Sequence, residues 1–274
     1  MRKILAAALA TIVLPSAAGA ITGPPISFST GNSIYLVNPD GSGLTLLYQG
    51  ARGTAVQSVD LKRGGGEVAF IENHVLKVLP YGANGRPIAG PRVISLPCPV
   101  ALSVDHNSAD DSLAVKDGCA PNHIWRVAAG AAAAYPQPLV TQPQTIGDVV
   151  WSRDGSRLYY EYIDGLRAFD PATGANMVVY PDHTVWSPTL NGDRLILAGT
   201  NNIYFIHDFA SGADAPGCTT GQMIHYGNDD AQMVYRIPAR NLSFYVAVQN
   251  SNCLGGPHVL TRAGAYAGID WAAP

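Results

Sequence analysis

The sequence predicts an all-β fold, a β-propeller of six four-stranded blades closed into a ring, and three observations predict it. Apolar, strand-like runs separated by turns fill the chain, which has 29 Gly and 20 Pro among its 274 residues. The one Ala-rich stretch, 127–138, contains Gly130 and ends in Pro138, which favours a loop over a helix. A motif of an apolar strand, a polar turn and a second strand recurs about every 42 residues, the length of a propeller blade.

The first 20 residues have the pattern of a secretory signal peptide. A basic start at Arg2 and Lys3 precedes an apolar run from Ile4 to Leu14 and an Ala-Gly-Ala cleavage site that ends at Ala20. We therefore expect a single mature domain at 21–274, exported to the periplasm or the medium. No later apolar stretch reaches the roughly 20 residues of a membrane helix, so the domain is expected not to span a membrane. A monomer is expected.

The six expected inner strands each end on a recognisable residue. These residues are Asp60, Asp105, Trp151, Trp186, Tyr226 and Trp271. Tyr226 is assigned because "YGNDDAQMVY" at 226–235 aligns position by position with "WSRDGSRLYY" at 151–160. After most of these residues come a polar turn and three further strands, so one blade follows another along the chain.

The two ends of the chain complement each other. Three expected strands, 26–30, 33–38 and 44–49, lack an inner strand, whereas the C-terminal strand 265–271 lacks the partners that should follow it. We expect the C-terminal strand to join the N-terminal three and complete the first blade. An open array would leave unpaired N–H and C=O groups at both of its ends, an aggregation hazard that a closed ring removes.

The motifs at 151–160, at "VWSP" (185–188) and at "NPDGSG" (38–43) resemble the repeats of TolB-type six-bladed propellers, a bacterial periplasmic family. The resemblance covers essentially the whole mature chain as a repeat pattern and implies a six-bladed ring with a role in the cell envelope. TolB itself has an α/β domain before its propeller, whereas here about five residues separate the cleavage site from the first expected strand.

Five residues are candidates for the rim of a central channel: Asp60, Asp105, His183, His225 and Asp270. Equivalent aspartates on neighbouring blades could bind a cation or act as acid and base, or each could accept hydrogen bonds from the turn that follows it, which we favour. The seven histidines could surround a metal, but they lie at unequal offsets from the blade anchors, so surface or loop positions are favoured. We predict no metal site and no catalytic residue.

Trp151, Trp186, Tyr226 and Trp271 are expected to pack between blades, with a ligand-stacking platform as the alternative. Cys98 precedes the third inner strand and Cys119 follows its partner strand, so a Cys98–Cys119 disulfide is geometrically reasonable. Cys218 and Cys253 then pair by exclusion, although they fall at opposite ends of the expected sixth blade.

The composition excludes several classes of function. The net charge of −3 becomes about −5 once Arg2 and Lys3 are removed, so a nucleic-acid binder is not expected. The nucleophile elbow, the P-loop and the HExxH motif are absent from the sequence, and no cofactor is predicted. We expect a module that binds a protein or peptide of the cell envelope. The alternative is a propeller-type lyase or hydrolase acting on extracellular carbohydrate or peptide.

Overall fold

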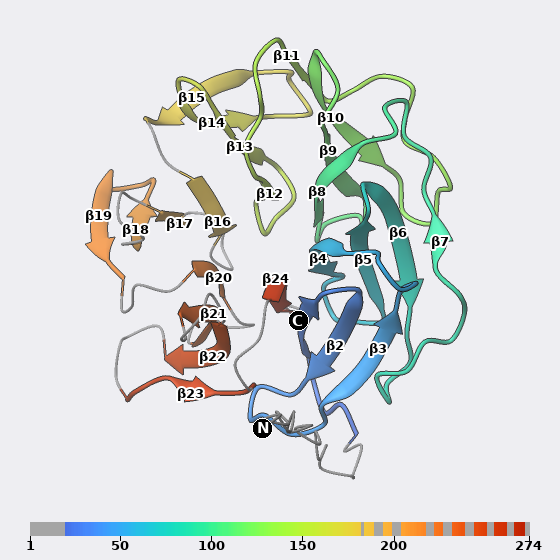
Figure 1. Ribbon diagram of the computed structural model, residues 1–274. Coiled ribbons are helices and arrows are strands. Elements are labelled where there is room, and N and C mark those ends of the chain that lie inside the picture. Colours follow the sequence, from blue (N-terminus) through green and yellow to red (C-terminus); the bar gives the residue numbers. More distant parts are fainter. Residues whose placement is uncertain are drawn as a thin grey trace, which may run out of the picture.

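The computed structural model describes residues 20–181, 184–188, 194–198, 204–217, 222–226, 232–238, 244–250, 255–261 and 266–271. These ranges contain 24 β-strands and no helix, and the strands form six four-stranded sheets. Figure 1 shows the sheets around a common axis, the arrangement of a β-propeller. The prediction of an all-β propeller is confirmed. The predicted signal peptide, apart from Ala20, lies outside the described residues.

Each sheet has an inner strand near the axis and three strands that follow outward. The inner strands are β4 (Val56–Leu61), β8 (Ala101–His106), β12 (Val149–Trp151), β16 (Thr184–Pro188), β20 (Gln222–Tyr226) and β24 (Tyr266–Trp271). The second strands are β1 (Ile26–Thr30), β5 (Glu67–Glu72), β9 (Leu113–Asp117), β13 (Leu158–Tyr162), β17 (Arg194–Ala198) and β21 (Gln232–Pro238). The third strands are β2 (Ser33–Val37), β6 (Val75–Pro80), β10 (Asn122–Val127), β14 (Gly165–Phe169), β18 (Tyr204–Asp208) and β22 (Phe244–Asn250). The outer strands are β3 (Thr45–Gln49), β7 (Arg92–Val93), β11 (Val140–Gln142), β15 (Asn176–Tyr180), β19 (Ala213–Pro216) and β23 (His258–Val259). Among the described residues no helix is suited to crossing a membrane.

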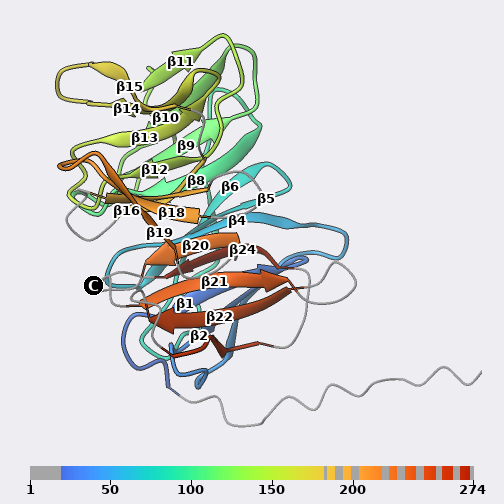
Figure 2. The ribbon, with the colours of Figure 1, turned by 90° about the vertical axis from the view of Figure 1, so that its left-hand side faces the viewer.

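The last strand, β24, belongs to the sheet of the first three. It pairs antiparallel with β1, with Ile26 opposite Trp271 and Ser27 opposite Asp270. In the view turned by 90°, Figure 2 shows β24 among β1, β20 and β21, and the order of the sheet places it next to β1. Gly268 permits the close packing of β24 on β4, because a Cβ at this position would lie 3.1 Å from the backbone nitrogen of Val59. A bulkier residue would force the two inner strands apart.

The hydrophobic core lies between neighbouring sheets. In one cluster Ile34 and Leu36 of the first sheet pack with Val68 and Phe70 of the next, and all four are fully buried. Comparable clusters bridge the second and third sheets, the third and fourth sheets, and the last and first sheets. Removing a buried aromatic such as Phe70 typically costs about 3–5 kcal/mol, so each sheet depends on its neighbours for stability.

The hairpin turns that follow the inner strands show which residues are equivalent. The bonds that open these turns run from Lys62 N to Glu67 O (3.0 Å), from Asn107 N to Ser112 O (2.7 Å) and from Ser152 N to Arg157 O (2.8 Å). Leu61, His106 and Trp151 are therefore equivalent. The sequence alignment had placed Asp60 and Asp105 opposite Trp151, and this assignment was wrong by one residue. Because side chains alternate along a strand, that shift moves a side chain to the other face of the sheet.

Candidate functional site

Three inner strands carry an aspartate one residue before their end. Asp270 lies on β24, Asp60 on β4 and Asp105 on β8, at equivalent positions of three successive sheets. Asp60 and Asp105 are thus equivalent, as the sequence predicts, and Asp270 joins them. We call the end of the sheets at which these strands finish, near Leu61 and His106, the carboxylate end.

Each of these carboxylates bonds to the backbone of the next inner strand. The Oδ2 atom of Asp270 accepts a hydrogen bond from Leu61 N at 2.7 Å, and that of Asp60 accepts one from His106 N at 2.8 Å. Asp105 Oδ2 accepts one from Trp151 N at 2.6 Å. The sequence predicts that each aspartate accepts hydrogen bonds from the turn that follows it. In the structure, each accepts a hydrogen bond from the neighbouring sheet instead. These three hydrogen bonds join three pairs of neighbouring sheets.

Burial and mutual repulsion disfavour the charged forms of two of these carboxylates. Asp60 is 8% exposed, and its burial, together with the charge of Asp270, raises its pKa to about 6. Burial and the charge of Asp60 raise the pKa of Asp105 well above its ordinary value. A nearby cation or a bound proton would offset the cost of burying these two carboxyl groups.

His106 supplies a positive charge beside Asp60. Its ring is buried, Nδ1 contacts the Asp60 carboxylate, and Nε2 lies 3.7 Å from Glu67 Oε1. Burial disfavours the imidazolium, but the Asp60 carboxylate outweighs it and raises the pKa of His106 to about 9. The His106 side chain in turn lowers the pKa of Glu67. His106 is therefore charged at neutral pH and lies between two carboxylates.

The prediction that His106 lies on the surface or in a loop is wrong, because His106 is the buried last residue of β8. A usable signal existed. His106 follows Asp105 as Leu61 follows Asp60, and a residue in register with a buried leucine is expected to be buried as well.

Several predicted residues cannot be placed beside this site. His183 lies outside the described residues. At His225, Trp186 and Tyr226 the structure describes the strand but not the side chain. Among the remaining anchors, Trp151 is 2% exposed and Trp271 is 6% exposed.

Both described tryptophans pack in clusters that join two sheets. Trp151 packs with Ala114 and Ile124 of the preceding sheet, and Trp271 packs with Val234 and Val246 of the sheet before its own. Trp271 Nε1 also donates to Pro24 O at 3.3 Å. Burial of this extent leaves little ring surface for stacking on a ligand, and it agrees with a packing role.

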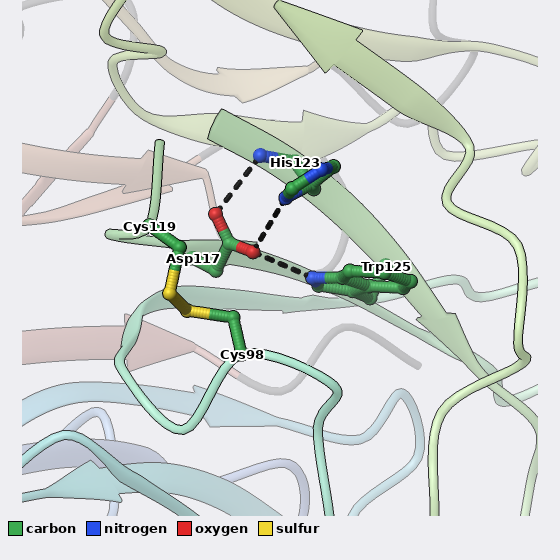
Figure 3. Close-up of a disulfide and its surroundings, with 5 residues drawn as sticks. All are labelled: Cys98, Asp117, Cys119, His123 and Trp125. Atoms are coloured by element: carbon green, nitrogen blue, oxygen red, sulfur yellow. Dashed lines mark hydrogen bonds and ion pairs between the residues drawn. A yellow bond between two sulfur atoms is a disulfide. The ribbon is translucent and has the colours of Figure 1, made fainter. Parts of the chain in front are cut away.

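The disulfide between Cys98 and Cys119 is present, with the Cα atoms 6.2 Å apart, and this prediction is confirmed. Beside it lies Asp117, which is fully buried and accepts bonds from His123 N (2.9 Å), His123 Nδ1 (2.8 Å) and Trp125 Nε1 (2.8 Å). Figure 3 shows these donors converging on the carboxylate. The two sulfur atoms and Asp117 lie close enough to hold a metal, but the sulfur atoms are bonded to each other. The cluster therefore braces the β9–β10 hairpin. Cys218 and Cys253 lie outside the described residues.

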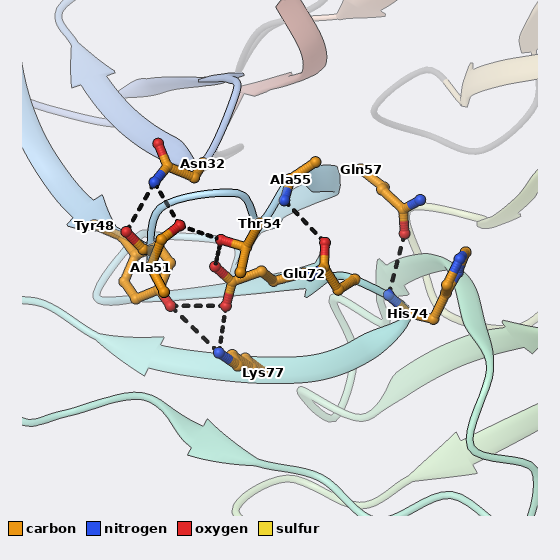
Figure 4. A network of polar contacts seen from close by, with 11 residues as sticks. Asn32, Tyr48, Ala51, Thr54, Ala55, Gln57, Glu72, His74 and Lys77 are labelled. Carbon is orange, nitrogen blue, oxygen red and sulfur yellow. Dashed lines mark hydrogen bonds and ion pairs between the residues drawn. The ribbon is translucent and has the colours of Figure 1, made fainter.

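A second polar network lies at the opposite end of the first two sheets. Glu72 accepts bonds from Tyr48 Oη at 2.9 Å and from Thr54 Oγ1 at 2.5 Å, and it pairs with Lys77 (Figure 4). Gly50 makes room for this carboxylate, since a Cβ there would lie 1.9 Å from Glu72 Oε1. The network joins β3, β5 and β6 and leaves Glu72 4% exposed, so it is a structural brace.

Comparison with known proteins supports the fold alone. No protein-family model and no curated protein matches the chain. Among solved structures, TolB from Acinetobacter baumannii matches with a TM-score of 0.73 and 11% identity, over 93% of this chain and 68% of that one. The fold is a β-propeller. A chain of a nidogen/laminin complex matches with a TM-score of 0.71 and 10% identity, over 91% and 98% of the two chains. A putative TolB from Agrobacterium tumefaciens matches with a TM-score of 0.66 and 10% identity, over 88% and 90%.

Proposed function

We propose that this chain is an exported, TolB-like propeller of six blades, closed as a ring, that binds a protein or peptide of the cell envelope through its channel mouth and loops. The observation that carries the proposal is the structural likeness to TolB over 93% of the chain. It acts without a cofactor, as a monomer, and binds no nucleic acid.

The contacts between inner strands support a closed ring. β24 contacts β4, β4 contacts β8, β8 contacts β12, and the series continues through β16 and β20 back to β24. A ring held in this way presents a rigid set of loops at each end, which suits a binding surface.

The hydrogen bonds of the three aspartates favour a binding role over a catalytic one. Asp60, Asp105 and Asp270 each accept a backbone N–H of the neighbouring strand, so their Oδ2 atoms serve the joints between sheets. A general acid or base must instead reach a substrate proton. The lyase or hydrolase alternative therefore gains no support from these three residues.

Export is supported by the signal-peptide pattern at 1–20 and by the Cys98–Cys119 disulfide, because disulfides persist in oxidising compartments. TolB propellers are also among the structural neighbours. Of the matched structures, one is described as a nidogen/laminin complex, so a similar fold takes part in a protein complex there.

Site-specific photocrosslinking in the envelope tests the proposal. A benzophenone amino acid would replace Ser156 at the carboxylate end, Ile163 at the opposite end, or Met177 on the outer strand β15, all of which are exposed. We expect one defined partner to be captured from an end position but not from Met177, and to bind the purified protein saturably. Capture from all three positions alike, or turnover of an envelope substrate without saturable binding of a partner, would overturn the proposal.

A further inference from the structure

The disulfide of the third sheet lies beside a buried carboxylate. One oxygen of Asp117 and the sulfur atoms of Cys98 and Cys119 all lie within 4.8 Å of one another. Figure 3 shows this carboxylate between the disulfide and the rings of His123 and Trp125. Reduction of the disulfide would therefore bring two thiols and a carboxylate, three possible metal ligands, to one place.

The Asp117 carboxylate keeps room for a further partner. Its Oδ1 atom accepts a hydrogen bond from His123 N, and its Oδ2 atom accepts bonds from His123 Nδ1 and Trp125 Nε1. A carboxylate has about four lone-pair sites, two on each oxygen. One site on Oδ1 is thus unused among the described residues, and the residue is fully buried. The three donors also fix the orientation of the carboxylate, as hydrogen bonds to metal ligands commonly do.

Backbone hydrogen bonds hold the two cysteine segments together without the disulfide. Gly118 N donates to Val100 O at 2.8 Å, and Ala101 of β8 lies opposite Asp117 of β9. The Cα atoms of the two cysteines are 6.2 Å apart. Two sulfur atoms on one Zn²⁺ lie about 3.8 Å apart, the edge of a tetrahedron with zinc–sulfur bonds of about 2.3 Å. Rotation of the two side chains gives this spacing while the backbone stays in place.

The two sulfur atoms differ in their exposure, which sets the course of reduction. Cys119 is partly exposed, whereas Cys98 is 5% exposed. A reducing thiolate therefore attacks Cys119 and releases Cys98 as a thiolate. A second thiolate then attacks the mixed disulfide and releases Cys119, and the reductant leaves as its own disulfide. A newly made chain starts in the same dithiol state, because disulfides form only in an oxidising compartment.

The ligand set selects the metal. Thiolates favour a borderline-soft ion such as Zn²⁺, whereas Ca²⁺ and Mg²⁺ prefer oxygen ligands. Two thiolates and a carboxylate carry three negative charges, and a divalent ion offsets two of them in a region where burial makes an unpaired charge costly. Three protein ligands leave the fourth tetrahedral position to a water molecule.

We propose that the reduced protein binds one Zn²⁺ through Cys98 Sγ, Cys119 Sγ and the Asp117 carboxylate. Binding displaces the two thiol protons and occupies both sulfur atoms, so zinc competes with oxidation. When the disulfide re-forms, the two thiolates pass two electrons to the oxidant and the ion leaves. The β9–β10 hairpin is thus braced by the disulfide in one state and by zinc in the other. This site does not depend on the proposed function.

Metal titration of the reduced protein tests the proposal. The mature protein is reduced with a phosphine, which becomes the phosphine oxide, and excess reductant is removed under nitrogen. Co²⁺ is the probe, because thiolate ligands give sulfur-to-cobalt charge-transfer absorption and four-coordination gives strong visible bands. We expect one Co²⁺ per chain, displaced by one Zn²⁺, and no such absorption from the oxidised protein. A reduced protein without the charge-transfer absorption overturns the proposal.

Three variants locate the metal. Cys98→Ala/Cys119→Ala should lose binding although it keeps Cys218 and Cys253, whereas Cys218→Ser/Cys253→Ser should retain it. Asp117→Asn should weaken zinc binding at least about tenfold, the lower end of the effect of residues that support a metal site. Circular dichroism and melting check that each variant is folded. Undiminished binding by Cys98→Ala/Cys119→Ala, or unchanged affinity in Asp117→Asn, rules out this site.

Alkylation of the unmodified protein gives an answer that needs no variant. Zinc should slow the reaction of iodoacetamide with Cys98 and Cys119 about tenfold or more, because the free thiolate is the nucleophile. Peptide mass spectrometry reads each cysteine separately. Zinc should also slow the re-formation of the disulfide by oxidised glutathione. Protection of Cys218 and Cys253 instead would place the metal elsewhere, and a chain that unfolds on reduction and is not refolded by zinc has no such site.

Discussion

Asp60 on β4 holds His106 on β8 twice, because its carboxylate accepts the backbone N–H at 2.8 Å and also pairs with the imidazole Nδ1. One aspartate thus fixes the register of two neighbouring sheets and keeps a buried charge compensated. The aspartates at the same position on β24 and β8 also accept a backbone N–H of the next inner strand. The joint between the second and third sheets should therefore respond most to pH.

Stability is expected to fall as pH rises from about 6.5 to 9. The folded pKa of His106 is about 9, above its ordinary value of 6.5, so its stabilising contribution is complete below pH 6.5 and lost as pH rises through 9. The shift corresponds to about 3 kcal/mol. Urea denaturation at several pH values measures the slope, and His106→Gln should flatten it, whereas His258→Gln at an exposed site should not. An unchanged slope in His106→Gln would contradict the assignment.

Asp60→Asn and Asp105→Asn should differ in their effects at pH 7. Asparagine at either position still offers an oxygen to the backbone N–H. At position 60, however, it leaves the buried His106 imidazolium without its counter-charge, and breaking a buried pair costs about 3–5 kcal/mol. At position 105 it removes a carboxylate whose charge the fold disfavours, so the change should stay within about 1 kcal/mol. Equal losses of unfolding free energy in the two variants would refute the pairing.

Replacing both Cys98 and Cys119 by Ser should lower the free energy of unfolding by about 3 kcal/mol. The disulfide spans a sequence separation of 21 residues, and closing a loop of this length restricts the unfolded chain by that order. Equilibrium unfolding without reductant measures the loss. The single variant Asp117→Asn, which keeps the disulfide, separates its contribution from that of the hydrogen bonds to Asp117. A double variant as stable as the unmodified protein would show that the bridge contributes nothing.

Tyr81→Phe should leave the free protein as stable as before or more stable, by about 1 kcal/mol, because it removes a buried hydroxyl whose proton finds no acceptor among the described residues. Tyr235→Phe is the matched comparison. Tyr235 is fully buried and donates to Gln249 Oε1 at 2.7 Å, so its loss should destabilise the protein by about 1–2 kcal/mol. Thermal melting of both variants distinguishes the two environments. A large loss in Tyr81→Phe would mean that the hydroxyl is already satisfied.

Deletion of Ala265 to Pro274 should leave the chain unfolded or aggregating. It removes β24, the partner of β1 and the neighbour of β4, and exposes an unpaired strand edge at the axis. Size-exclusion chromatography and melting report the outcome, with a chain that ends at Trp271 as the control that keeps β24. Unchanged melting of the longer deletion would count against a closed ring.

Much of the fold could be predicted because the strand signal repeats along the chain. The alternating apolar pattern, the turn residues and the unmatched strand at the C-terminus predicted the inner strands, and the position of Cys98 and Cys119 predicted their bridge. Register was predicted less well. Trp151 was aligned with Asp60, one residue off, because composition alone does not show which face of a strand a residue occupies.

The candidate site could be predicted only in part, because its contacts join distant segments. Asp60 and Asp105 were identified by their repeated context, and Asp270 was named as a rim candidate without its equivalence to them. The bonds from these aspartates to the next inner strand depend on how two sheets pack.

The pairing of β1 with β24 also has a consequence for biosynthesis. The partners lie about 240 residues apart, so β1, β2 and β3 emerge from the ribosome long before the strand that completes their sheet. Contacts of such long sequence separation form late and slow folding. The first sheet must therefore wait, with its inner edge unpaired, until nearly the whole chain has been translated, and a protein exported before folding would need a chaperone to shield that edge during the delay.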